Sequence, residues 1–402
     1  MKSVYLVATL DTKGPEAAFV RDRLKALGVP VVLVDAGCMG PPAVPADIPR
    51  EKVFDAAGMK ALGDRGKAVA AAAEGAAKLA REAHARGELA GVLGIGGSAG
   101  SNIGTAAMRA LPIGVPKVMV STLASGQVRQ YVGDKDIFML NSIVDILGVN
   151  RISRTVLAQA AQAMAGLVTL EGAPAGAGDR PLVAATMFGV TTPCVMRAKK
   201  ALEDAGYEVL VFHATGNGGQ AMESLIAEGL IEGVLDVTTT ELADELCGGF
   251  LTAGPARLTA AGKAGVPQVV SVGATDMVNF YGPETVPARF KGRKLYPHNP
   301  QVTLMRTTPE ENARIGADLG RKVSEAKGPK SILLPAKGVS AIDREGQPFD
   351  DPAARAALAG AIRQTAKGVE IVELDRHIND PEFADAAARK LLDLMKSRKE
   401  QR

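Results

Sequence analysis

The stretch Leu89-Ala-Gly-Val-Leu-Gly-Ile-Gly-Gly-Ser-Ala-Gly-Ser-Asn102 decides the fold of the first half of the chain. Its apolar run over residues 90–95 is typical of a buried parallel strand, and the glycines after it predict a tight turn into a helix that begins near Ser101 or Asn102. Such a turn lets backbone N–H groups point into a concavity, and the helix N-terminus adds a partial positive charge. The stretch therefore predicts a site for an anion, most often a phosphate.

Apolar runs alternate with helical segments along the whole chain, which predicts an α/β protein made of two Rossmann-like, doubly wound domains with parallel sheets. A helix rich in alanine is expected at residues 64–86 and a terminal helix at 384–395, whereas residues 278–300 are predicted to be irregular. Strands are expected at residues 4–9, 31–34, 90–95 and 117–121 in the first half, and at 209–212, 331–334 and 370–374 in the second.

A length of 402 residues is too great for one ordinary core and favours two domains. The glycine-, alanine- and proline-rich segment 171–180 is predicted to be the linker, between a nucleotide-binding domain at 1–170 and a second α/β domain at 181–402. Short matches recur in the same order in both halves, such as Gly114-Val-Pro-Lys-Val and Gly265-Val-Pro-Gln-Val. They indicate either an internal duplication or two unrelated domains that share a common βαβ pattern.

Composition excludes several classes of function. The formal net charge is only +3, without a basic block, and aromatic residues make up 4% of the chain with no tryptophan, so nucleic-acid binding is not expected. Cys38, Cys194 and Cys247 are too far apart to form a metal-binding pair, which is typical of reduced thiols in a cytoplasmic protein. The apolar run before Asp11 is short, and none reaches the ~20 residues of a membrane span. We therefore expect a cytoplasmic protein without a membrane partner.

Three kinds of phosphate site are compared for the glycine-rich turn. A P-loop is excluded because Gly66-Lys67 and Gly262-Lys263 are each followed by alanine. Gly94, Gly96 and Ala99 fit the dinucleotide pattern, but no acidic residue ends the next strand, so NAD is disfavoured.

The third kind is a nucleotide held at the carboxyl ends of several strands, with Lys13 on an outer phosphate and Asp11 on Mg²⁺ or a ribose. The competing explanation is that Thr12 caps a helix and the glycines only allow close packing. The residues predicted to bind the nucleotide are Asp11, Thr12, Lys13, Asp35, Gly37, Gly96, Gly97, Ser98, Gly100, Ser101, Thr122, Ala124, Ser125 and Gly126.

These residues resemble the Tm-1-like ATP-binding family, relatives of the tomato mosaic virus resistance protein whose bacterial members are of uncharacterised function. The resemblance implies a Rossmann-like N-terminal domain that binds ATP with Mg²⁺, a second α/β domain and a homodimer. The antiviral role of the plant member is not carried over. The motifs that carry the resemblance are Thr9-Leu-Asp-Thr-Lys, Gly96-Gly-Ser, Thr122-Leu-Ala-Ser-Gly, Tyr131-Val-Gly, Asn150-Arg-Ile-Ser-Arg, Phe212-His-Ala-Thr-Gly-Asn-Gly-Gly, Asp236-Val-Thr-Thr-Thr-Glu-Leu, His298-Asn-Pro and His377-Ile-Asn-Asp-Pro.

A second site is predicted where the strand at 209–212 ends in His-Ala-Thr-Gly-Asn-Gly-Gly. His213, Glu241 and His298 are its candidate catalytic residues, with His213 as acid or base near neutral pH. Glu241 also fits a capping box with Thr238, which is the favoured explanation for it, and Asp244 is expected to face solvent. A metal site of His213, His298, His377 and Asp236 is the alternative, although no motif spacing supports it.

The sequence predicts an ATP-binding two-domain protein. As an enzyme it would act on a small acidic or carbonyl metabolite in the cleft between the domains, by ATP-linked activation of a carboxylate or phosphorylated metabolite. Arg257 or Arg306 would hold the anionic substrate. One alternative is a non-catalytic ATP-binding regulator that engages a partner protein. Another is a lyase or hydrolase that uses a divalent metal and no nucleotide.

Overall fold

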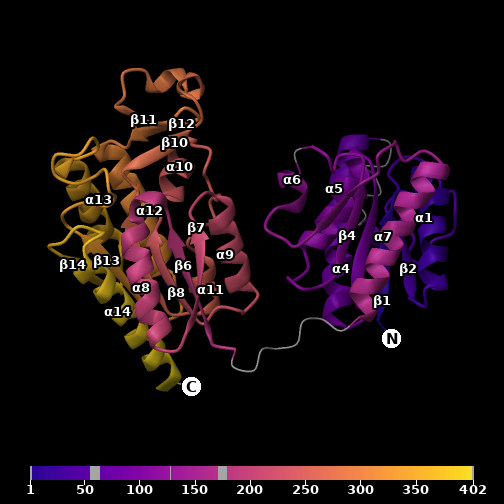
Figure 1. Cartoon of the computed structure of the whole chain (residues 1–402), viewed down its shortest axis with the longest axis horizontal. Coiled ribbons are helices and arrows are strands. Elements are labelled where there is room, and N and C mark those ends of the chain that lie inside the picture. Colours follow the sequence, from indigo (N-terminus) through magenta and orange to yellow (C-terminus); the bar gives the residue numbers. More distant parts are fainter. Residues whose placement is uncertain (1, 55–63, 127, 171–178, 401–402) are drawn as a thin grey trace. The chain divides into compact units, whose positions relative to one another are not determined.

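The computed structural model describes residues 2–54, 64–126, 128–170 and 179–400. The chain divides into two compact units, Met1–Ala175 (unit 1) and Gly176–Arg402 (unit 2), and each is a parallel sheet with helices on both faces (Figure 1). The predicted α/β class is therefore confirmed. Most of the predicted linker, residues 171–178, lies outside the described residues.

The sheet of unit 1 has five parallel strands in the order β2-β1-β3-β4-β5. The chain builds outward from β1 to β2 and then returns to the other side of β1 for β3, so a topological switch point lies between β1 and β3. In open α/β sheets ligands bind at such a point, outside the carboxyl ends of the strands. The strands are β1 (Ser3–Ala8), β2 (Val31–Asp35), β3 (Leu89–Gly96), β4 (Lys117–Ser121) and β5 (Phe138–Asn141).

Helices cover both faces of this sheet. On one face α1 (Leu10–Ala26) and α7 (Arg151–Thr169) pack on Val4, Leu6 and Ile95, and on the other α4 (Arg65–Ala85) and α5 (Ser98–Arg109) pack on Tyr5, Val7 and Val92. The helix α4 approaches the sheet closely because all of its buried residues are alanines. The helix α5 begins three residues earlier than predicted. Two short helices, α2 (Arg50–Val53) and α6 (Arg129–Val132), lie in the connections.

Unit 2 repeats this architecture. Its six parallel strands run in the order β7-β6-β8-β9-β13-β14. The first five of these correspond in order to β2-β1-β3-β4-β5 of unit 1, and β14 is added at the far edge. The shared order is what an internal duplication predicts. The strands are β6 (Leu182–Met187), β7 (Glu208–His213), β8 (Gly233–Thr238), β9 (Gln268–Gly273), β13 (Lys330–Pro335) and β14 (Glu370–Leu374).

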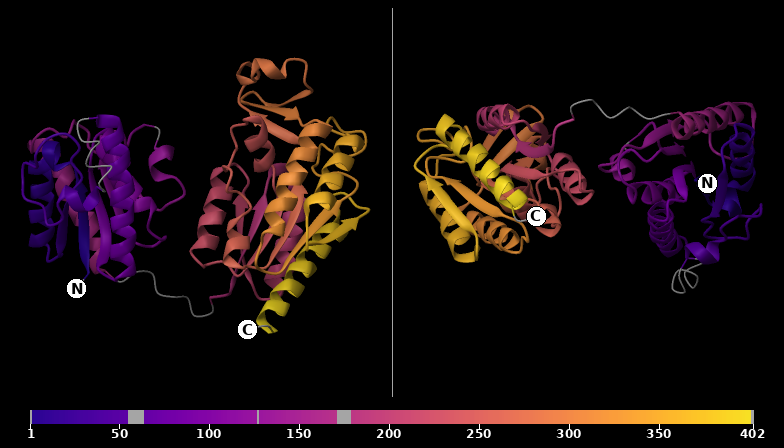
Figure 2. Two further views of the ribbon diagram at one scale, coloured as in Figure 1. Left: turned by 180° about the vertical axis from the view of Figure 1, so that it is seen from behind. Right: turned by 90° about the horizontal axis from the view of Figure 1, so that it is seen from below.

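The helices of unit 2 also form two layers. The helix α8 (Thr192–Asp204) shares one face of the sheet with α14 (Pro381–Glu400), which is yellow in Figure 2. The other face carries α9 (Asn217–Ala227), α10 (Glu241–Cys247), α11 (Ala260–Ala264), α12 (Pro309–Ser324) and α13 (Pro352–Thr365).

A small antiparallel sheet in the order β10-β12-β11 follows β9. The prediction of an irregular segment at 278–300 is therefore wrong at its two ends, where β10 and β11 lie, whereas residues 281–294 form no strand or α-helix. These strands, β10 (Met277–Phe280), β11 (Leu295–Asn299) and β12 (Val302–Arg306), are only four or five residues long, and β10 pairs with β12 across the intervening chain. Such short, non-local strands leave a weak local signal. Among the described residues, no helix combines the length and apolar character needed to cross a bilayer.

Candidate functional site

Unit 1 brings its four predicted strand ends to one edge. The strands β2, β1, β3 and β4 are consecutive neighbours in the parallel sheet. Because parallel strands end at the same edge, the segments after them lie side by side: Asp35 to Gly37, Asp11 to Lys13, Gly96 to Ser101 and Thr122 to Gly126. The switch point falls between the second and third of these segments.

The N-terminus of α5 lies at this edge, where the sequence predicts an anion site. A Cβ at Gly96 would lie 2.6 Å from the Cα of Gly100, so glycine is required for the close approach of β3 and α5. Gly97 is the residue before the helix, and no described side chain caps the helix there. A Cβ at Gly97 would meet only the Oγ1 of Thr122, at 3.6 Å. The first N–H groups of α5 have no partner within the helix, and no described side chain caps them.

A cavity of about 600 Å³ adjoins this helix end. Three segments line it: the start of α4, the first turns of α5, and α6. Ser98 is the one lining residue that the sequence predicts as a ligand. Among the other seven, Arg65 is an exposed cation at the start of α4, and Tyr131 offers an aromatic ring on α6. The only sequence signal for Tyr131 is the motif Tyr131-Val-Gly. The full lining is Arg65, Gly66, Val69, Ser98, Ala99, Asn102, Gln130 and Tyr131.

The segment after β1 carries one free carboxylate oxygen. The Oδ2 of Asp11 accepts hydrogen bonds from the N–H groups of Met39 (2.7 Å) and Gly40 (3.2 Å). Its Oδ1 is buried and has no hydrogen-bond partner among the described residues. The Nζ of Lys13 donates to the carbonyl of Ile146, and Thr12 is exposed.

Asp35 and Ser101 are both fully buried, and their side chains form hydrogen bonds with other groups of the protein. Asp35 accepts the N–H groups of Leu10 (3.2 Å) and Gly37 (2.8 Å) and the Nε of Arg50 (2.9 Å), so it fixes the loops around Asp11. The Oγ of Ser101 lies 2.6 Å from that of Ser121, which ties α5 to β4. Ser101 is in the first turn and not at the helix start because α5 begins at Ser98. Both residues position the site without facing its open side.

The remaining predicted residues of unit 1 are more accessible. Thr122 and Ala124 are half-buried, and Ser125 and Gly126 are exposed, in a turn that the N–H of Gly126 closes on the carbonyl of Leu123 (3.1 Å). Gly100 is buried against the carbonyl of Ile95 and serves packing. The turn from Thr122 to Gly126 is thus the accessible part of the predicted set in this region.

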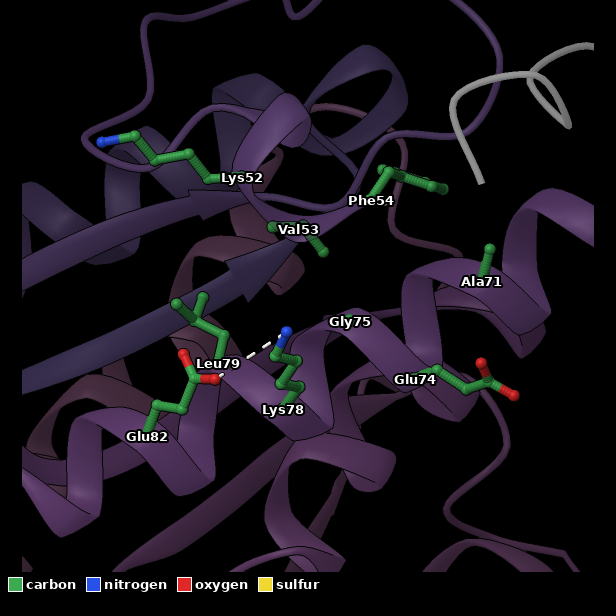
Figure 3. A pocket seen from close by; sticks show the side chains of 9 residues that line it. All are labelled: Lys52, Val53, Phe54, Ala71, Glu74, Gly75, Lys78, Leu79 and Glu82. Atoms are coloured by element: carbon green, nitrogen blue, oxygen red, sulfur yellow. Dashed lines mark ion pairs between the residues drawn. The ribbon is translucent and has the colours of Figure 1, made fainter. Parts of the chain in front are cut away.

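A second hollow of unit 1, about 280 Å³, lies between α2 and α4 and is shown in Figure 3. Its lining mixes apolar groups with an ion pair between Lys78 and Glu82 (3.9 Å). Gly75 lets α4 pass close to the backbone of Val53. None of the nucleotide-binding residues predicted from the sequence lines this hollow, so we do not assign the site to it.

In unit 2 the glycines after β7 bind a carboxylate of the protein itself. The N–H groups of Gly216 (2.7 Å) and Gly219 (3.1 Å) both donate to the Oε1 of Glu241. Gly216 has a φ of +82°, which favours glycine, and a Cβ on Gly219 would strike the Glu241 carboxylate. These two backbone donors of the predicted second site are therefore used within the protein.

Arg257 completes this internal anion site. Its Nε donates to the Oε2 of Glu241 (2.6 Å), and its Nη1 and Nη2 donate to the two carboxylate oxygens of Asp236 (2.6 and 2.7 Å). Burial raises the pKa of Glu241, and the adjacent Arg257 partly offsets that rise. Glu223 also accepts from Arg257 (3.3 Å), and all four side chains are buried or nearly so. This network joins β8, α9 and α10.

Arg257 and Arg306 are thus not the substrate-binding arginines that the sequence predicts. Arg306 is buried and donates to the carbonyl of Phe349 (2.8 Å) and to Asp343 (3.2 Å). The capping box of Thr238 and Glu241 does not form either, because Thr240 precedes α10 and no side-chain cap is made. The prediction that Asp244 faces solvent is wrong: it is fully buried and accepts the Nδ2 of Asn279 (2.8 Å).

The histidines of unit 2 lie apart in the fold. His213 ends β7, is exposed and packs beside the ring of Phe188, with the ring centroids 5.3 Å apart. Desolvation lowers the pKa of His213, which favours the neutral imidazole. His298 is exposed on the antiparallel sheet. His377 is buried with its Nε2 2.8 Å from the carbonyl of Ser340. Within the described residues, no group of three His, Cys, Asp or Glu side chains is arranged to hold a metal ion.

Comparison with known proteins covers both units. Residues 2–173 match the N-terminal domain and residues 180–395 the C-terminal domain of the uncharacterised protein family UPF0261. The chain is 48% identical to a UPF0261 protein of Clostridium tetani over 98% of this chain and 99% of that protein. It is 49% identical to one of Rhizobium meliloti over 96% of this chain and 98% of the relative.

A plant protein is also similar. The ToMV resistance protein Tm-1 of Solanum lycopersicum is 40% identical over 97% of this chain, and the match spans 55% of the plant protein. The resemblance inferred from the sequence motifs is confirmed. This chain belongs to the UPF0261 family, with unit 1 as its N-terminal and unit 2 as its C-terminal domain.

Proposed function

We propose that unit 1 binds a nucleotide, ATP with Mg²⁺, at the N-terminus of α5. The observation that carries this proposal is the uncapped start of a twelve-residue helix at the switch point of a parallel sheet, beside a cavity of about 600 Å³. Backbone N–H groups at such a position favour a phosphate group. A cavity of this size falls in the range of small-molecule sites.

The residues around the helix end suit the parts of such a ligand. Arg65 supplies positive charge for the phosphates, and Tyr131 supplies a ring on which a base stacks. Asp11 does not line the cavity but follows the neighbouring strand β1 at the same edge. Its unpartnered Oδ1 is a hard oxygen ligand of the kind that Mg²⁺ prefers, and we assign it to a magnesium ion that neutralises the phosphates. The turn from Thr122 to Gly126 adds backbone groups to the same edge.

The corresponding helix start in unit 2 differs from that of α5, and this difference supports the proposal. The helix α10 follows β8 as α5 follows β3, but it begins with Glu241, which occupies the N–H groups of Gly216 and Gly219. An acidic side chain at this position opposes a phosphate. We therefore assign the nucleotide to unit 1 alone, and we retain His213 as the candidate acid–base residue of unit 2.

The experiment measures co-purified ligands of the full chain by native mass spectrometry, followed by ATP turnover with and without pools of small carboxylic acids. Turnover that depends on an acid supports an ATP-linked enzyme. Bound ATP without turnover supports the regulator that engages a partner protein. Absence of ATP binding in the presence of Mg²⁺ contradicts the proposal. The homodimer stays a prediction, which light scattering after size-exclusion chromatography tests.

A further inference from the structure

Arg355 in the first turn of α13 has the geometry of an anion-binding group. Its Nη1 donates to the Oδ1 atoms of Asp343 (2.8 Å) and Asp350 (2.9 Å). Every hydrogen bond that Arg355 makes within the described part of the chain uses this one nitrogen. The edge formed by Nε and Nη2 is therefore left for another partner.

The guanidinium is held in place by a buried carboxylate. Asp343 is fully buried, its Oδ2 accepts the N–H of Val339 (3.0 Å), and its Oδ1 also pairs with Arg306 (3.2 Å). A side chain fixed in this way loses less conformational entropy when it binds a ligand. Arg306, although it does not face a substrate, thus helps to position an arginine that can.

Two other arginines of the chain bind a carboxylate through their Nε and Nη2 atoms. The Nε and Nη2 of Arg197 each lie 2.7 Å from one oxygen of the Asp385 carboxylate. Arg363 uses the same two nitrogens on Glu373. This planar pair of donors matches a carboxylate or phosphate group better than an ammonium does.

Arg355 opens on a cavity of about 760 Å³ at the carboxyl ends of β13 and β14. Pro335 and Leu374, the last residues of these strands, pair in register, so the loops after them share one edge. Lys337 and Arg344 add two cations to the lining, and Pro352 places the N-terminus of α13 there. Glu345, Asp350 and Asp380 balance these charges, which favours a ligand that also carries hydrogen-bond donors.

We propose that this cavity binds a small hydroxylated or aminated molecule through its carboxylate or phosphate group, which occupies the Nε–Nη2 edge of Arg355. Arg344 and Lys337 are the neighbouring cations, and the acidic residues of the lining accept from the hydroxyl or amino group. The site belongs to unit 2 and does not depend on nucleotide binding in unit 1.

Histidine NMR of the full chain tests this site without interference from unit 1. The sequence has four histidines, and His377 lines the cavity. The chain is labelled with ¹³C-histidine, its signals are assigned by single histidine substitutions, and it is titrated with malate and, separately, with inorganic phosphate. We expect the His377 signal to move saturably with at least one of them, and the better of the two identifies the anionic group.

The variant Arg355→Lys keeps the charge but removes the two-donor edge, so we expect binding about tenfold weaker. Arg363→Lys, an exposed arginine on the same helix, is the matched control and should bind as the original chain does. If Arg355→Lys fails to fold, the exposed Arg344→Gln takes its place and should also weaken binding. A His377 signal that responds to neither anion, or equal affinities in the variant and the original chain, would overturn the proposal.

Discussion

The Nε of Arg257 lies 2.6 Å from the Oε2 of Glu241, and both side chains are completely buried. Through Glu241 this pair reaches the N–H groups of Gly216 and Gly219, and through its other nitrogens Arg257 holds Asp236. A glycine-rich loop that resembles a ligand site in the sequence is thus closed by an acid of the protein. The start of α5 in unit 1 carries no such acid among the described residues.

Replacement of Arg257 by methionine should destabilise unit 2 strongly. It leaves the carboxylates of Asp236 and Glu241 buried without their cation, and removal of one partner of a buried ion pair typically costs about 3–5 kcal/mol. The free energy of unfolding from urea titration measures the effect. The control Arg197→Met breaks an exposed pair and should cost at most about 1 kcal/mol. Equal losses in the two variants would contradict the role assigned to Arg257.

Asp244 should make the stability of unit 2 depend on pH. Desolvation raises its pKa in the folded chain to about 7, well above the value of about 4 expected when unfolded. The protonated carboxyl therefore stabilises the fold below about pH 4, and this contribution is lost as the pH rises toward 7.

The variant Asp244→Asn should remove this dependence. The amide of Asn279 can turn over to accept from the new side chain, because its Oδ1 has no partner among the described residues. We expect the free energy of unfolding to fall more steeply between pH 5 and pH 7 in the original chain than in the variant. Parallel curves for the two proteins would show that Asp244 is not the titrating group.

Tyr131→Leu should separate recognition of the base from recognition of the phosphates. Stacking of a base on an aromatic ring contributes about 1–3 kcal/mol, so calorimetry should show Mg-ATP binding weakened by about tenfold or more. Inorganic triphosphate, which has no base, should bind the variant and the original chain equally well. A variant that loses affinity for both ligands equally would mean that Tyr131 does not stack on the base.

The sequence predicts the parallel sheets well because their strands are continuous apolar runs that end in polar turns. It fails for β10, β11 and β12, whose few residues are paired with chain neighbours that only the folded unit brings together. The glycines at 96, 97 and 100 suggest a longer turn, which predicts a start of α5 near Ser101. Gly100 lies instead inside the helix, where it allows contact with the end of β3.

The candidate site is predictable only in part for a similar reason. Strand order places the segments after β1, β2, β3 and β4 at one edge, and their polar residues in the sequence predict this. No sequence pattern shows that Arg257 is buried between two acids, or that Arg355 keeps two donors unused. These roles depend on side-chain contacts made by β8, α10 and α13. Packing between segments far apart in the sequence determines those contacts.

The measurement that tests the central claim most directly is calorimetric titration of Mg-ATP into the Gly97→Asp variant. A side chain fits at position 97 without a clash, so the variant should fold, while its carboxylate repels a phosphate at the start of α5. The control Gly360→Asp lies in equally open space on α13. The account predicts that Gly97→Asp loses ATP binding and that Gly360→Asp keeps it; ATP binding of original affinity in a folded Gly97→Asp protein would contradict it.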